Sequence, residues 1–156
     1  MFGEITQGSM QKIVHYLQQY CDMSERSSFV DLGSGLGKPS MHVAATPPGV
    51  RASFGVEYLQ HCWALSVVNL TNAISQGKLG GNVCFVHRNV CELASLMPFT
   101  HVYAFDRGWS TRDMHQLSSV FNRSQRTVRF YVSYHSPRDI IFEFGFDVEH
   151  VGKVSV

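Results

Sequence analysis

The hydrophobic positions of this chain form short apolar runs separated by segments of helical spacing. Five runs are typical of buried strands, namely residues 29–32, 52–57, 82–87, 101–105 and 128–134. Between and before them, apolar residues recur every three or four positions and predict helices. These helical segments are residues 10–21, 38–45, 59–76, 89–97 and 111–122. The alternation of strand and helix predicts an α/β fold with a parallel sheet covered by helices.

The last seventeen residues have a different pattern. Residues 140–149 alternate apolar and acidic positions in their second half, and residues 151–156 alternate again. No helical segment separates them. The pattern therefore predicts an antiparallel hairpin at one edge of the sheet.

A glycine-rich turn after the first strand is the strongest local motif. Residues 29–37 read Phe-Val-Asp-Leu-Gly-Ser-Gly-Leu-Gly, and Asp31 lies near the carboxyl end of the strand, where open α/β sheets bind ligands. Gly33, Gly35 and Gly37 let the backbone turn sharply and approach a bound molecule. The spacing G-x-G-x-G differs from the G-x-G-x-x-G of dinucleotide enzymes.

A second acidic residue closes the next strand. Glu57 follows the last glycine by 57 − 37 = 20 residues, where a carboxylate can accept both ribose hydroxyls of a nucleoside. Together with Asp31 and the glycines, it indicates a nucleoside site. The alternative is a strand–turn–helix whose role is structural only.

Composition narrows the class of partner. The chain has 156 residues, 44% hydrophobic and 16% charged, which suits one globular domain. A net charge of +1 gives no support to nucleic-acid binding, although residues 87–88 and 123–126 are small basic spots. The four cysteines form no C-x-x-C pair, which is typical of a reduced, intracellular protein. No apolar run reaches transmembrane length, so we expect no membrane association.

A zinc site is the competing interpretation of three residues near the third strand. Cys84, His87 and Cys91 are metal-ligating types, but structural zinc needs four ligands at recognised spacings and no second pair is present. We therefore expect no metal.

Three segments together resemble one enzyme family. Residues 2–6 (Phe-Gly-Glu-Ile-Thr), 30–37 and 54–57 (Phe-Gly-Val-Glu) resemble the catalytic core of the disruptor-of-telomeric-silencing histone-lysine methyltransferases, which lack a SET domain. The resemblance implies a Rossmann-like class I methyltransferase fold with a mostly parallel, seven-stranded-type sheet and a C-terminal antiparallel hairpin. We expect a single catalytic domain over residues 1–156, shortened at both ends.

The resemblance also implies a binding site for S-adenosylmethionine (SAM), with S-adenosylhomocysteine (SAH) as the product. The opening loop would lie over the methionine part, the glycine turn would cradle the cofactor, Glu57 would take the ribose, and the residues after strand three would hold adenine. The implied cofactor-binding residues are Phe2, Gly3, Glu4, Thr6, Asp31, Gly33, Ser34, Gly35, Gly37, Lys38, Glu57, Asn89 and Val90. Lys38 stands where the family often has glutamine, and Asn89-Val90 where it usually has Asp-Phe.

The implied catalytic residues follow strand four, where this chain departs from the family. An Asn-Asn-Phe type motif is expected there, but the chain has Phe105, Asp106 and, three residues later, Trp109. Phe105 and Trp109 would form an apolar slot for a lysine side chain, with Phe2 and Tyr134. Asp106 would hold the target ammonium, although a carboxylate also favours the charged amine, and transfer needs the neutral one.

Plainer interpretations of these residues stay open. Glu4 can be a helix-start charge, Asp106 and Arg107 a surface ion pair, and Trp109 a core aromatic. At the level of function, the resemblance implies a monomeric, nuclear histone-lysine N-methyltransferase that acts on a core histone in a nucleosome, with only weak support for contact with nucleosomal DNA. The alternatives are another class I methyltransferase, for RNA or a small molecule, and a catalytically silent SAM-binding module.

Overall fold

The computed structural model describes residues 4–156 and contains one five-stranded, wholly parallel sheet. The strand order is β3-β2-β1-β4-β5. From β1, the strands are added toward one edge of the sheet up to β3 and toward the other edge from β4, so the order reverses at β1. The strands are β1 (Ser28–Leu32), β2 (Ala52–Glu57), β3 (Val83–His87), β4 (His101–Ala104) and β5 (Phe130–Val132). The α/β class and the parallel sheet are confirmed, with five strands in the described residues in place of the seven-stranded type.

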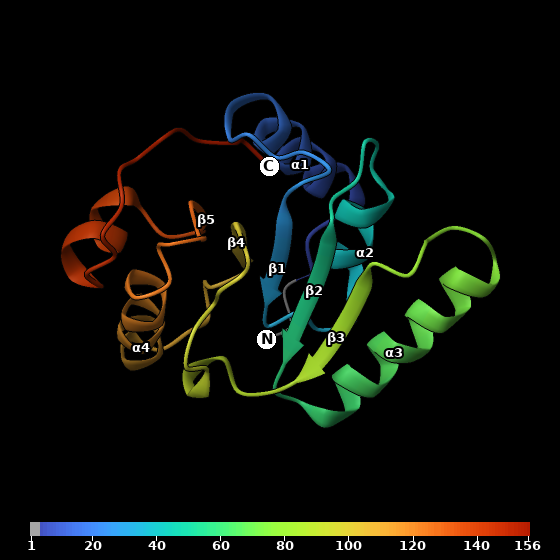
Figure 1. Cartoon of the computed structure of the whole chain (residues 1–156). Coiled ribbons are helices and arrows are strands. Elements are labelled where there is room, and N and C mark those ends of the chain that lie inside the picture. The colour runs from blue at the N-terminus through green and yellow to red at the C-terminus, as the bar shows by residue number, and fades with distance from the viewer. Residues whose placement is uncertain (1–3) are drawn as a thin grey trace.

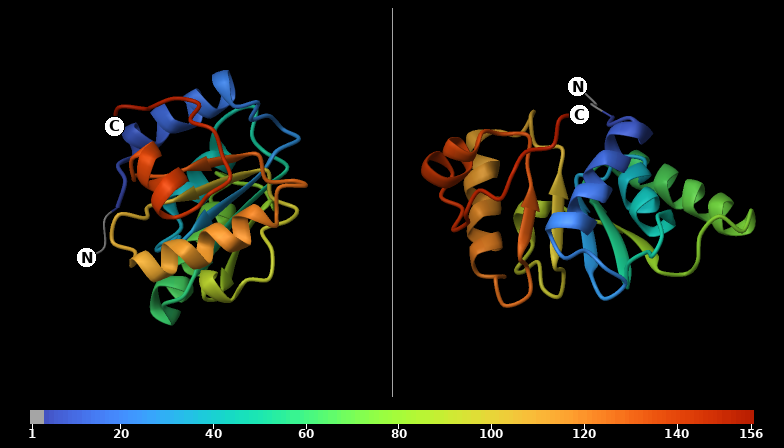
Figure 2. Two further views of the ribbon diagram at one scale, coloured as in Figure 1. Left: turned by 90° about the vertical axis from the view of Figure 1, so that its left-hand side faces the viewer. Right: turned by 90° about the horizontal axis from the view of Figure 1, so that it is seen from above.

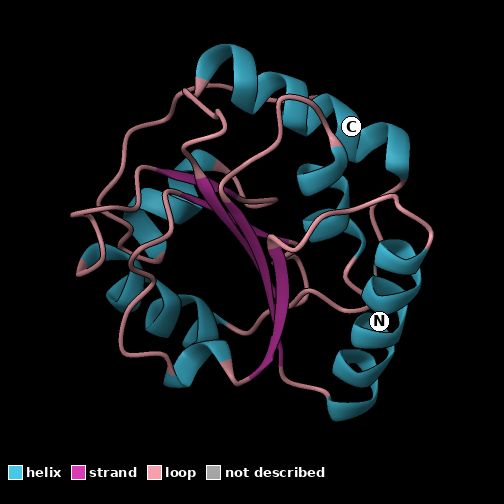
Figure 3. Cartoon of the chain, turned by 45° about the vertical axis from the view of Figure 1, so that its right-hand side comes forward, coloured by secondary structure: helices cyan, strands magenta, loops and turns pink. Residues whose placement is uncertain are grey.

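Helices cover both faces of the sheet (Figures 1, 2 and 3). One layer holds α1, α2 and α3, and the other holds α4 and the C-terminal helical turn η2. The bounds are α1 (Gln7–Tyr20), α2 (Lys38–Ala45), α3 (Gln60–Ser75), the 3₁₀ turn η1 (Val90–Glu92), α4 (Thr111–Asn122) and the π-helical turn η2 (Asp139–Glu143). The strands therefore end at one edge between two helical layers, which is where the site forms.

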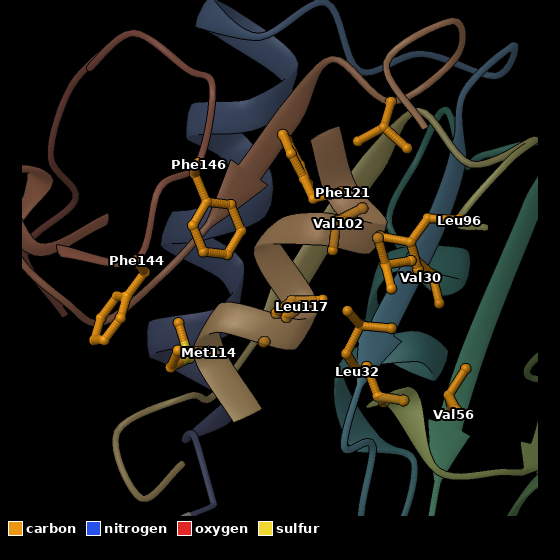
Figure 4. Packing of buried hydrophobic residues seen from close by; sticks show 14 of the residues in the cluster. Val30, Leu32, Val56, Leu96, Val102, Met114, Leu117, Phe121, Phe144 and Phe146 are labelled. Atoms are coloured by element: carbon orange, nitrogen blue, oxygen red, sulfur yellow. The ribbon is translucent and has the colours of Figure 1, made fainter. Parts of the chain in front are cut away.

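Alternate side chains of the strands feed two hydrophobic clusters. Val30 and Val102 point toward α4, where they pack with Leu117 and Phe121 in the larger cluster (Figure 4). Phe29 points the other way, into a cluster built on α1 and α2. Because successive strand residues face opposite sides of a sheet, one apolar run supplies both cores.

Two helices form where the sequence predicts them because they carry both a cap and an apolar stripe. Thr6 caps α1 by accepting a hydrogen bond from the Ser9 N–H at 3.2 Å, and Ser110 caps α4 through the Asp113 N–H at 3.1 Å. The residues of the two apolar stripes are buried: Met10, Ile13, Val14, Leu17 and Cys21 for the first helix, and Met114, Leu117, Val120 and Phe121 for the second.

Helix α3 buries only a narrow part of its apolar surface. Only Cys62 and Ser66 of this helix are buried, whereas Leu65, Val68 and Ile74 are 44–54% exposed. The helix packs beside β3, which is the edge strand of the sheet. Little of the sheet surface is therefore available to cover the other apolar residues of α3.

Two predicted elements are shorter than the pattern suggests. The helix expected over residues 89–97 is only the turn η1, because the chain then bends away and the Leu96 N–H donates to Ser124 Oγ at 2.8 Å. The strand expected over residues 128–134 is limited to β5. It stops early because the Tyr134 N–H bonds to the Asp106 carboxylate in place of a neighbouring strand.

The C-terminal hairpin is a wrong prediction. Residues 139–143 form η2, and residues 144–156 run back across the molecule as an irregular segment toward α1 (Figures 1 and 2). The buried positions Ile140 and Phe144 lie four residues apart, which is helical spacing, and Phe142 between them is 80% exposed. Near the end of the chain, Val154 packs against the cluster that contains the α1 residues.

Candidate functional site

A cavity of about 800 Å³ lies at the carboxyl ends of the strands, where the strand order reverses. Its lining comes from the loops after β1, β2, β3 and β4, together with the N-terminal ends of α2, α3 and α4. Doubly wound sheets bind ligands at this position because two adjacent loops diverge to opposite faces there.

The glycine turn forms the floor of this cavity. Gly33, Gly35 and Gly37 have φ angles of 78°, 53° and 89°, in the left-handed region that favours glycine. The Gly33 and Ser34 N–H groups both donate to the Val56 carbonyl, at 2.8 and 3.0 Å, which folds the turn back onto β2. Gly33, Ser34 and Gly35 line the cavity, whereas Gly37 begins α2 beneath the ring of Phe85.

Gly55 in β2 gives the turn room to approach. A side chain at Gly55 would place its Cβ 2.6 Å from Ser34 Oγ and 2.6 Å from the Phe85 ring. Ser34 Oγ is itself buried without a hydrogen-bond partner among residues 4–156. A glycine inside a strand is a sequence signal of such close approach.

Glu57 ties the turn to the next loop. Its Oε1 accepts from the Gly35 N–H at 2.9 Å and its Oε2 accepts from the Leu59 N–H at 3.1 Å. The side chain is only 7% exposed but still lines the cavity. Each carboxylate oxygen has a second lone pair, so Glu57 can accept ligand hydroxyls while it keeps these bonds.

Asp31 is the more buried of the two acids, at 2% exposure, and it also lines the cavity. Burial, and secondly the charge of Glu57, raise the pKa of Asp31 well above its usual value. The hydroxyls of Tyr103 and Tyr134 are 2.8 Å apart nearby, and burial raises the pKa of both, so they stay protonated. The structure thus holds an acid and two neutral hydroxyls at the ends of β1, β4 and β5.

The opening loop reaches the mouth of the cavity. Glu4 and Lys38 form an ion pair at 2.7 Å with both side chains about half exposed, and both line the cavity. Thr6 lies away from the lining, because its hydroxyl caps α1. Phe2 and Gly3, also predicted to contact the cofactor, fall outside the described residues.

The wall beyond β3 is formed by η1. Asn89 caps this turn, with its Oδ1 accepting from the Cys91 N–H at 3.0 Å, and the 7%-exposed Val90 packs into the larger core cluster. Both residues line the cavity, as the nucleoside interpretation requires.

Asp106 needs a correction, because its carboxylate is turned away from the cavity. It is fully buried and accepts from Tyr131 Oη at 2.5 Å, Ser133 Oγ at 2.6 Å and the Tyr134 N–H at 2.9 Å. His135 Nε2 lies 3.1 Å from the Asp106 backbone carbonyl. The prediction that Asp106 holds a substrate ammonium does not match this geometry, and neither does a surface ion pair with Arg107.

Aromatic residues form the wall beside Asp31. Phe105 lines the cavity and packs on Tyr134 with ring centroids 4.6 Å apart. Trp109 also lines it and lies so close to Gly33 that a Cβ there would be 3.4 Å from the indole. Trp109 packs at the same time against the larger core cluster, so it serves both the core and the cavity.

Sequence reasoning missed several lining residues. They include Tyr58, His61, Cys62, Cys91, Tyr103 and Asp113. The first four lie within five residues after the strand ends at Glu57 and His87, so their position in the sequence is a signal that could have found them. Asp113 lies in the first turn of α4 and reaches the cavity only because α4 packs on η1.

Two further searches concern metals and membranes. Among residues 4–156, no three His, Cys, Asp or Glu side chains are grouped as a metal site would need. Within the same residues, no helix has the length and apolar character to cross a bilayer.

Comparison with models of protein families shows the family of this chain. The model of the family described as "Histone methylation protein DOT1" matches residues 1–81, which contain the opening loop, the glycine turn and Glu57. The chain belongs to this family. A search of curated proteins finds no match to this DOT1-family chain.

Solved structures show the same fold with distant sequences. Magnesium protoporphyrin IX methyltransferase (ChlM) from Synechocystis PCC 6803, solved with bound SAM, aligns over 100% of this chain and 81% of its own, with 15% identity and a TM-score of 0.66. An RNA methyltransferase from Salinibacter ruber, in complex with SAH, aligns over 85% of this chain and 76% of its own, with 17% identity and a TM-score of 0.61. These likenesses establish the class I methyltransferase fold.

The chain is short relative to some of these proteins. A SAM-dependent methyltransferase from Clostridium acetobutylicum ATCC 824 aligns over 90% of this chain with a TM-score of 0.62 and 11% identity. The chain spans only 55% of that protein.

Proposed function

We propose that this DOT1-family chain binds SAM in the cavity and transfers its methyl group to a lysine. The observation that carries the proposal is that the glycine turn, Asp31 and Glu57 converge on one cavity at the strand-order reversal. SAM supplies an activated sulfonium methyl, so the protein needs no metal and no nucleophilic residue for the transfer. The chemistry of the lining suits each part of the molecule.

The polar and apolar groups that line the cavity fit three parts of SAM. Asp31 offers a carboxylate to the ammonium of the methionyl part, and Glu57 offers two oxygens to the ribose hydroxyls. The turn leaves space for close approach because Gly33 has no side chain against Trp109. The Asn89 side chain and Val90 offer hydrogen bonding and apolar contact to the base.

The aromatic wall beside Asp31 suits a lysine side chain. Phe105 and Trp109 line the cavity and offer apolar and cation–π contacts to the aliphatic stem and the amine, and Tyr134 packs against Phe105. The acceptor must be a neutral amine in line with methyl and sulfur. The buried and fully bonded Asp106 does not compete by holding the amine charged, which removes the difficulty its sequence position raised.

We further propose that the lysine belongs to a core histone within the nucleosome, and that the protein acts in the nucleus. This rests on the family match over residues 1–81. The net charge of +1 gives little attraction to nucleosomal DNA from this chain, so the histone surface is the proposed contact.

Titration calorimetry with SAM and SAH is the first test. We expect micromolar binding by the wild-type chain and its loss in Asp31→Ala and Glu57→Ala, with Glu143→Gln as a charge-matched control. Glu143 lies exposed in η2, away from the cavity. A folded wild-type chain that binds neither ligand would reject the SAM site.

Methylation assays then separate the substrate classes. Labelled SAM is offered with nucleosomes, free histones and RNA under identical conditions. Transfer to nucleosomes supports the proposal, whereas transfer to RNA alone would place the chain with other class I methyltransferases. SAM binding without transfer to any of them would indicate a silent binding module.

A further inference from the structure

Helix α3 presents a broad apolar face without charge to the solvent. Its buried side is limited to Cys62 and Ser66. The opposite side carries exposed apolar residues, namely Ala64, Leu65, Val67, Val68 and Ile74. Residues 58–77 contain no Asp, Glu, Lys or Arg, although 16% of the chain is charged. Because a surface helix normally carries charged residues on its solvent side, this face is suited to contact with protein.

A second cavity, an apolar groove of about 320 Å³, lies on the sheet face that also packs on α4. Phe54, Val56 and Val86 form its floor, and Leu93 and Phe99 belong to its outer wall. Apart from two serines, every lining residue that the structure describes is apolar. The groove stays open because the helix predicted over residues 89–97 is reduced to η1, and no helix forms over residues 93–99. An apolar groove of this kind suits the apolar face of a helix.

The exposed edge of the sheet is partly covered by α3. The Trp63 indole N–H donates to the Phe85 carbonyl of the edge strand β3 at 3.0 Å, and the His87 ring stacks on Trp63 with centroids 5.5 Å apart. A second β3 strand therefore could not pair along this edge without displacing Trp63. Contact at this end of the molecule falls to the outer face of α3.

The α3 face and the groove are placed so that two copies of the chain can cover both. Helix α3 lies beyond β3, at the outer end of the molecule, in the layer opposite α4 (Figures 1 and 2). A two-fold axis along the β3 edge, in the plane of the sheet, brings α3 of one copy to the groove side of its partner, and the reverse. Such an isologous contact closes after two copies. Because α3 carries no charge, it brings no unpaired ion into the apolar groove.

We propose that the protein forms a two-fold symmetric dimer in which α3 of each copy occupies the apolar groove of the other. The dimer differs from the monomer that the family resemblance implies, and it does not depend on the SAM site. A helix of 16 residues is about 24 Å long, so each contact is modest and the two together make a small interface. We therefore expect a reversible dimer that forms at micromolar concentrations.

Sedimentation velocity of the full chain over a range of concentrations tests the proposal. We expect the wild type to shift from monomer to dimer as the concentration rises. Val68→Lys on α3 and Ala52→Glu in the groove should each weaken the dimer about tenfold or more, because each places an unpaired charge in an apolar contact. The matched control is Val151→Lys, at a residue that is 58% exposed, against 54% for Val68, and that lies off both surfaces. This control should dimerise like the wild type.

An equimolar mixture of the two variants identifies what occupies the groove. A mixed dimer keeps one unaltered contact, formed by α3 of the Ala52→Glu copy and the groove of the Val68→Lys copy. Its other contact brings the new lysine and the new glutamate into one interface, where opposite charges offset each other. We therefore expect the mixture to associate more tightly than either variant alone.

Three results would overturn the proposal. A folded wild type that stays monomeric at every concentration would leave both surfaces to a different partner. Weakening by Val68→Lys but not by Ala52→Glu would indicate that the two α3 helices contact each other directly. A dimer that neither substitution weakens would have its interface elsewhere. Circular dichroism checks the fold of each variant, and Leu93→Glu in the outer wall of the groove replaces Ala52→Glu if that variant is unfolded.

Discussion

Asp31 combines deep burial with a position on the cavity wall, which makes its ionisation costly until a cation binds. Its carboxyl is 2% exposed, and among residues 4–156 no Lys or Arg forms an ion pair with it. Its raised pKa means that the folded state binds this proton more tightly than the unfolded chain does. Folding free energy and ligand binding are therefore coupled at one residue.

The coupling predicts the pH dependence of stability. When folding raises the pKa of an acid, its protonated form contributes fully to the free energy of unfolding below the unfolded pKa of about 4. That contribution is lost as the pH rises through the folded pKa. We expect Asp31→Asn to remove this loss, so that the variant gains stability relative to wild type as pH increases. Urea unfolding between pH 4.5 and 8 measures the difference. Parallel curves for the two proteins would contradict the raised pKa.

At the scale of elements, Asp106 joins the ends of β4 and β5. Its carboxylate collects two hydroxyls and one backbone N–H from residues 131–134, and it thereby holds the loop that carries Phe105 and Trp109. Burial, followed by Asp106, raises the pKa of Tyr131, so this phenol stays a donor. The Asp106 carboxylate therefore holds the aromatic wall in place although it does not itself line the cavity.

Removing the Asp106 carboxylate should destabilise the ends of β4 and β5. Asp106→Ala leaves three partly buried donors without their acceptor, at about 1 kcal/mol or more each, so we expect a loss of about 3 kcal/mol in the free energy of unfolding. Asp106→Asn keeps one acceptor oxygen and should lose less. Urea unfolding measures both, with the exposed Asp147→Asn as the charge control. A loss below 1 kcal/mol in the alanine variant would reject this role.

The elements also show how far the sequence alone can reach. The helix over residues 111–122 has matching bounds because a serine cap and a regular apolar stripe point to the same element. The strand prediction for residues 140–149 is wrong because a few alternating positions also satisfy a four-residue spacing. The partners of Asp106 lie 25–28 residues later in the chain, and no local sequence pattern predicts their contact with it.

At the scale of the whole molecule, the cavity is built from loops that span four of the five strands and both helical layers. A ligand that contacts Asp31, Glu57, Asn89 and Asp113 would connect β1, β2, η1 and α4. Such a ligand binds the native state and has no comparable site in the unfolded chain. Binding must therefore raise the stability of the entire domain by mass action.

This linkage gives the last prediction. SAH at about one hundred times its dissociation constant should add about 2.7 kcal/mol, which for a domain of this size raises Tm by roughly 5–11 °C. Scanning calorimetry measures the shift, and a single transition that moves as one would show that both halves of the sheet share the ligand. Glu57→Ala should unfold at the same temperature with and without SAH. A wild-type transition that splits, with only one part moving, would show instead that the ligand stabilises a local substructure.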